Sequence, residues 1–178
     1  MNLSLAIPLV LHELATLVWI GGMFFAHFAL RPTIKQTLEP PARIQVAQGV
    51  FRRFFPWVWT AIATLWLTGT WVALVAMQGK VGLHVILMAG IALLMTLIFV
   101  FLYVMPYRKM RIAVEYENWR WASAKFSNIR KLMAVNLMLG LLTTVIAVGG
   151  PMVIPGIEQM MSKAPAASAT QRPADEGR

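Results

Sequence analysis

The sequence predicts an all-α integral membrane protein, a four-helix bundle with short interfacial helices in its two cytoplasmic connections. Hydrophobic residues make up 58% of the 178 residues and charged residues only 13%, whereas a soluble domain carries about 25% charged residues. Four apolar stretches are each long enough for a bilayer, because ~20 helical residues cross its ~30 Å hydrocarbon core. The charged residues collect between these stretches, as they do in multi-pass membrane proteins.

Four spans are expected, at about residues 7–30, 56–77, 81–105 and 132–154. Each is predominantly apolar and has the length of a transmembrane helix. The sequence shows no internal repeat and no second domain. The spans therefore belong to one transmembrane domain, residues 1–156.

Prolines and polar segments are expected to mark the ends of the spans. Arg31-Pro32 should end the first span and Pro106 the third, because proline removes a helical hydrogen bond and disfavours helical geometry in the residue before it. Residues 33–55 place arginines and apolar residues at helical spacing, which predicts a short amphipathic helix at the interface. Residues 157–178 have the composition of a disordered polar tail.

The basic residues of the connections predict the orientation of the chain. The connections after the first and third spans carry five and seven Lys and Arg residues, and the connection after the second span has only Lys80. The positive-inside rule then puts both basic connections in the cytoplasm and both termini in the periplasm. The expected location is a bacterial inner membrane, crossed four times.

The net charge of +9 has a membrane explanation. The basic residues lie beside the spans, where they face anionic headgroups, so the expected partner is the lipid bilayer and not nucleic acid. The absence of cysteine excludes disulfides, thiolate metal sites and thiol catalysis. The sequence also lacks a glycine-rich phosphate loop, a pair of carboxylates within a span and a Ser-His-Asp candidate, which argues against phosphate chemistry and hydrolysis.

Two histidines within spans are the strongest functional signal. His12 lies about one and a half turns from the outer end of the first span and His84 about one turn from the outer end of the third, so both have a similar depth. An ionisable group there costs ~2.5–3.5 kcal/mol to insert and usually faces a partner. Two imidazoles on facing helices suit the axial positions of a haem b, or two positions around a copper ion.

The faces below these histidines complete the candidate cofactor site. Helical spacing places Trp19 below His12 and Met88 below His84. We therefore take these four residues as candidates for cofactor binding, with the two histidines as metal ligands. The alternatives stay open, because a bond between the two imidazoles, or from His12 to Glu13, would satisfy them without a cofactor, and methionine in membrane helices is usually a packing residue.

Three further polar groups lie within the spans. Glu13 points ~100° away from His12 around the helix, where it would orient a neighbouring imidazole, accept a proton or pair with Lys80. His27 lies ~22 Å further along the same helix and is expected to bond locally or to face headgroups. Asn136 in the fourth span is expected to bridge helices.

The first span resembles a known family. The segment HELATLVWIGG, with His12, Trp19, Gly21 and Gly22, is similar to the first helix of copper-resistance D (CopD) domain proteins. The segments GLHVILMAG and RKLMAVNLMLGLL in the third and fourth spans are similar to that family too. The resemblance implies a four-helix inner-membrane domain in copper handling or membrane redox chemistry, with a redox or copper-delivery partner that the sequence does not identify.

The same architecture resembles, more distantly, the HemJ-type membrane protoporphyrinogen oxidase. His12 and His84 match the histidines of that family's first and third helices, and Ile86 stands where that family has a lysine. This resemblance implies an enzyme of haem biosynthesis as an alternative function. A non-catalytic structural membrane subunit is the third alternative. The sequence leaves open whether any reaction is catalysed and whether the chain forms a homo-oligomer.

Overall fold

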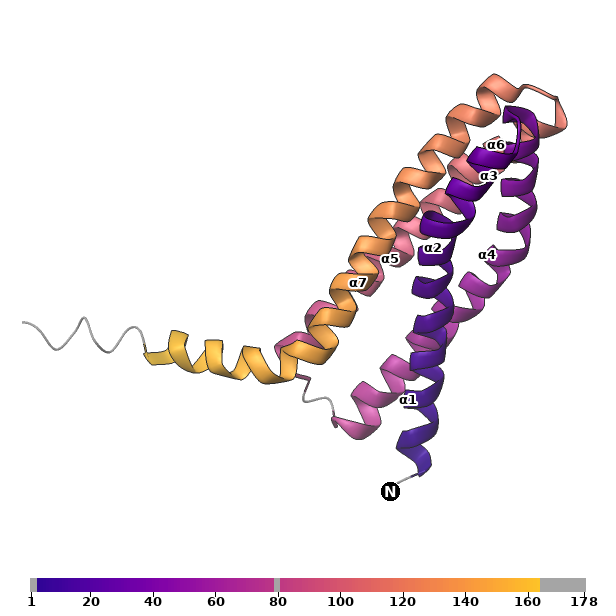
Figure 1. Ribbon diagram of the computed structural model, residues 1–178. Coiled ribbons are helices and arrows are strands. Elements are labelled where there is room, and N and C mark those ends of the chain that lie inside the picture. Colours follow the sequence, from indigo (N-terminus) through magenta and orange to yellow (C-terminus); the bar gives the residue numbers. More distant parts are fainter. Residues whose placement is uncertain (1–2, 79–80, 164–178) are drawn as a thin grey trace, which may run out of the picture.

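The computed structural model describes residues 3–78 and 81–163, and its regular structure in these ranges is entirely helical. Four helical segments of this part are long and apolar enough to cross a membrane: Leu5–Thr37, Pro40–Val75, Leu83–Glu115 and Trp119–Gly150. Figure 1 shows them running side by side for much of their length. The predicted all-α four-helix bundle is confirmed, and the chain is a multi-pass membrane protein.

The first segment is one continuous run of helix that contains two wider π-helical turns. Its consecutive pieces are α1 (Leu3–Thr16), η1 (Leu17–Gly21), α2 (Gly22–Phe25), η2 (Ala26–Leu30) and α3 (Arg31–Thr37). The chain therefore stays helical through Arg31-Pro32, where the sequence predicted an end. Pro32 stands in the first turn of α3, directly after η2, and there its missing N–H breaks no regular helical bond.

The second segment consists of α4 (Pro40–Trp71) and η3 (Val72–Ala76). Residues 40–55, expected in a separate interfacial helix, form the first half of α4, and the helix continues through Pro56. Side chains on both sides of this proline are buried in one core at helical spacing: Ala47, Phe51, Phe55, Val58 and Ile62. Tertiary packing thus outweighs the local preference of proline.

In the third segment, too, the helix continues through a proline. The third and fourth segments consist of α5 (Leu83–Leu102), η4 (Tyr103–Tyr107), α6 (Arg108–Glu115) and α7 (Trp119–Lys163). Pro106 lies inside η4 and so does not close the third helix, because the π-helical turn accommodates it. Helix α7 includes residues 157–163, the first part of the expected tail. The remainder of that tail, 164–178, and residues 79–80 of the expected tight connection lie outside the described residues.

Each segment is longer than a bilayer requires. Leu5–Thr37 has 33 residues, which at ~1.5 Å per residue gives ~50 Å against a ~30 Å hydrocarbon core. The short helices α3 and α6 lie together at one end of the bundle (Figure 1). Both belong to the connections that carry most of the basic residues, and this end is called the basic end below.

The core lies along the axis of the bundle. Helix α1 packs mainly against α4, and α5 packs mainly against α7. Phe55 connects these pairs, because its ring stacks on Phe51 and meets Phe99 and Tyr107 edge-on. Large apolar side chains such as Leu67 are exposed on the outside, as expected of helices that face lipid.

Candidate functional site

A hydrogen bond to the second segment holds the imidazole of His12. Its Nδ1 lies 2.8 Å from Oγ1 of Thr68. The hydroxyl of Thr68 donates its hydrogen to the backbone carbonyl oxygen of Thr64, at 2.6 Å. The Thr68 oxygen therefore accepts from His12 Nδ1–H, and the neutral imidazole carries its free lone pair on Nε2.

Gly69 lies beside the imidazole of His12. A Cβ at position 69 would lie 3.4 Å from Cε1 and 3.9 Å from Nδ1 of His12. A larger side chain at this position would therefore crowd the edge of the ring that bonds to Thr68. His12 itself is half-buried.

His84 lies in the first turn of α5, and two glycines lie close to it. A Cβ at Gly150 of α7 would lie 2.8 Å from Cβ of His84, and a Cβ at Gly82 would lie 2.8 Å from its Cε1. Real Cβ atoms do not approach so closely. Glycine at both positions therefore allows the half-buried imidazole to sit against α7.

His12 and His84 belong to different helix pairs. His12 lies in the α1–α4 pair and His84 in the α5–α7 pair, and the ribbons of the two pairs diverge toward the end where α1 and α5 begin (Figure 1). Among the described residues, the hydrogen bond of the His12 ring goes to Thr68. Ligation of one group by both imidazoles stays a prediction.

The other candidates on these two helices have separate environments. Trp19 in η1 is 3% exposed and meets the ring of Phe99 edge-on, and its Nε1–H has no hydrogen-bond acceptor. Met88 is half-buried one turn beyond His84, and Glu13 is exposed. Trp19 therefore packs in the core, whereas the side chains of Met88 and Glu13 remain accessible.

Asn136 of α7 is buried at 1% exposure, and its Oδ1 accepts no hydrogen bond from the described residues. One turn further along, a Cβ at Gly140 would lie 2.9 Å from Cγ1 of Ile20 and 3.2 Å from Cε of Met95. At this level α7 therefore packs closely against both the first and the third segments.

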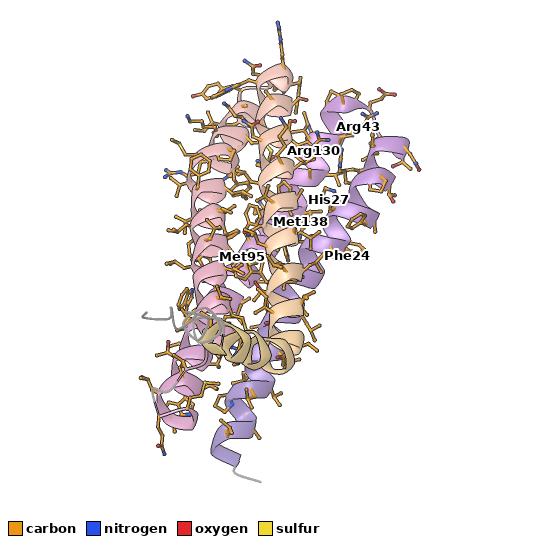
Figure 2. All side chains as sticks on the ribbon, turned by 90° about the vertical axis from the view of Figure 1, so that its left-hand side faces the viewer. Phe24, His27, Arg43, Met95, Arg130 and Met138 are labelled. Atoms are coloured by element: carbon orange, nitrogen blue, oxygen red, sulfur yellow. The ribbon has the colours of Figure 1, made fainter. Side chains whose placement is uncertain are left out.

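His27 lies at the basic end, where it lines a cavity together with Arg31 and Arg130. Figure 2 shows His27 and Arg130 toward the same end of the bundle. This cavity has a volume of about 30 Å³, which is room for about two waters.

Arg130 has few partners for its positive charge. One terminal nitrogen donates to Ser127 Oγ at 3.3 Å, and the guanidinium carbon lies 5.5 Å from the centre of the Phe126 ring. Its Nε–H is buried and has no acceptor within the part of the chain that the structure describes. Among the described residues, no carboxylate lines the cavity.

The sequence interpretation did not single out Thr68 or the cavity. Thr68 had one available signal, because it is a polar residue in the second half of the second span, at a predicted depth near that of His12. Arg31 and Arg130 stand at the ends of two apolar stretches that meet the basic connections. Their position beside His27 depends on how the helices are rotated, which hydropathy does not reveal.

Within residues 3–78 and 81–163, no three His, Cys, Asp or Glu side chains lie together as metal ligands. Comparison of the chain with protein-family models, with curated proteins and with solved structures gave no significant match. The fold therefore defines the class, a multi-pass helical membrane protein. The resemblance to CopD and HemJ proteins stays a prediction.

Proposed function

We propose that this protein holds one haem b between its first and third membrane segments, with His12 and His84 as axial ligands. Its function would then be copper handling or membrane redox chemistry. A haem in this position supplies one-electron transfer. The protein's own contribution would be to hold one imidazole on each of these segments and to leave Nε2 of His12 free.

The observation that carries this proposal is the hydrogen bond between His12 and Thr68. A metal-bound histidine almost always donates its other ring N–H to an oxygen, which fixes its tautomer and orientation. Here Nδ1–H donates to Thr68, so Nε2 is the nitrogen left for a metal.

The arrangement of the helices also supports the proposal. The α1–α4 and α5–α7 pairs diverge toward the end that carries the two histidines (Figure 1). A group ligated by both imidazoles would join the pairs where their own packing is weakest. We therefore expect the group to stabilise this end of the bundle as well as to react there.

An absorption spectrum of the detergent-solubilised protein tests this proposal. We expect a Soret band in the wild type and its loss in His12→Ala and in His84→Ala. His27→Ala is the matched control, because it removes the third histidine at the opposite end of the bundle and should retain the band. A colourless wild-type protein after haem addition, or a band unaffected by both substitutions, would contradict haem ligation.

Copper is the second candidate, because Met88 lies half-buried one turn from His84. A thioether and an imidazole together suit Cu(I). A colourless protein that binds Cu(I), less tightly in His84→Ala and in Met88→Leu, would favour copper. Restored growth of a strain that lacks protoporphyrinogen oxidase would instead favour the oxidase, and failure of all three tests would favour a structural subunit.

A further inference from the structure

The cavity at the basic end has positively charged and polar groups in its lining but no negative ones. His27 and Arg31 come from the first segment and Arg130 comes from α7. The other lining residues are apolar, among them Phe51 and Phe126. This composition would suit an anionic group attached to an apolar body.

Arg130 in this cavity lacks an acceptor that an anion would supply. Among the described residues, Nε–H of Arg130 is buried without a partner, and a buried donor in that state destabilises the protein. The positive charges of Arg31 and Arg130 also repel each other. A phosphate oxygen would relieve both effects, because a guanidinium group binds phosphate through parallel N–H···O bonds.

The cavity lies at the end of the first apolar stretch, where lipid headgroups are expected. The first membrane segment begins at Leu5, and the 22 residues from there to His27 give a rise of ~33 Å, the thickness of the hydrocarbon core. The apolar stretch ends a few residues later, at Arg31. A phosphate at the bilayer surface would therefore reach the cavity without leaving the interface.

We propose that this cavity binds the phosphate group of an anionic lipid in the leaflet at the basic end of the bundle. Arg31 and Arg130 bind the phosphate oxygens beside His27, and the glycerol and acyl chains remain in the bilayer outside the cavity, whose volume of about 30 Å³ admits only the oxygens. Basic pockets between membrane helices bind anionic headgroups in this manner. The site is independent of the histidine pair, because it lies at the opposite end.

Native mass spectrometry of the full chain in non-ionic detergent tests the proposal, with phosphatidylglycerol and phosphatidylcholine as probes. We expect phosphatidylglycerol to be retained in preference to phosphatidylcholine. Arg31→Gln and Arg130→Gln should each weaken its binding about tenfold, while Arg130→Lys should retain part of the affinity because it keeps the charge. Arg52→Gln is the matched control, since Arg52 is an exposed arginine of α4 outside the cavity.

Circular dichroism and size-exclusion chromatography of each variant show that a loss of lipid does not reflect a loss of fold. Equal retention of the two lipids by the wild type, or an equal loss in Arg52→Gln, would overturn the proposal. Inorganic phosphate is the second probe. If it binds alone and displaces phosphatidylglycerol with the same dependence on Arg31 and Arg130, the cavity takes a free oxyanion and the lipid assignment is overturned.

Discussion

His12 and Thr68 connect the first two membrane segments through a 2.8 Å hydrogen bond that selects the tautomer of the imidazole. Thr68 is itself buried and donates to the carbonyl oxygen of Thr64. The ring is thereby tied to the backbone of α4 through a single hydroxyl group. The direction in which Nε2 points, and with it any ligand role of His12, therefore depends on Thr68.

Thr68→Val should weaken the binding of the proposed cofactor without changing the shape of the site. Valine has the size of threonine but offers no acceptor to Nδ1–H, and loss of such an outer partner costs about 10–100-fold in metal affinity. Titration of the apoprotein with haem, followed at the Soret band, measures the change. Thr70→Val is the control, because Thr70 is exposed on the same helix. Equal affinity in both variants would show that Thr68 does not orient a ligand.

Gly140→Ala should destabilise the bundle. The added methyl group would meet Cγ1 of Ile20 at 2.9 Å and Cε of Met95 at 3.2 Å, and such overpacking costs about 1–3 kcal/mol. Gly90→Ala is the matched control. It lies within α5 with nothing within 4 Å of the added carbon, so it should be neutral or stabilise the helix by about 0.5–1 kcal/mol.

Thermal unfolding of both glycine variants in the same detergent, followed by circular dichroism, measures the difference. We expect a lower midpoint for Gly140→Ala and an unchanged or higher midpoint for Gly90→Ala. Equal midpoints would mean that α7 can move away from the first and third segments at little cost.

The sequence predicted the number of membrane segments but not where the helices end. Hydropathy over ~20 residues reports the spans directly, because burial in lipid requires an apolar helix. The ends were predicted from proline, and there local rules failed. Pro32 follows one π-helical turn and Pro106 lies inside another. Pro56 lies inside α4, where the packing of the helix outweighs the local effect of the proline.

The sequence could predict the position of the candidate residues along the spans but not the direction of their side chains. Position along a span fixes the depth of His12 at ~1.5 Å per residue, whereas one residue turns a side chain by ~100° around the helix. Only the packing of α1 against α4 brings His12 to Thr68. Depth alone could not show whether the imidazole faces the second segment or the third.

Asn136→Leu should leave the stability of the bundle unchanged or raise it. Asn136 is 1% exposed and its Oδ1 has no hydrogen-bond partner. Burial of such a group costs about 1–3 kcal/mol, which an apolar side chain of similar volume avoids. Thermal unfolding in detergent measures the change, with Asn128→Leu on the exposed face of α7 as control. A marked drop in the midpoint for Asn136→Leu alone would indicate that a water or a bound group satisfies the amide.

The orientation of the chain can be tested with single cysteines, because the wild type has none and gives no background labelling. Connections with five and seven basic residues, against one in the connection between the second and third spans, predict a cytoplasmic basic end. In intact spheroplasts, a membrane-impermeant thiol reagent should label Leu83→Cys at the start of α5. It should label Gln36→Cys in α3 and Arg120→Cys in α7 only after lysis; all three positions are exposed. The reverse labelling would place His12 and His84 in the cytoplasmic leaflet and the arginine-lined cavity in the outer one. A lipid bound there would then come from the opposite leaflet.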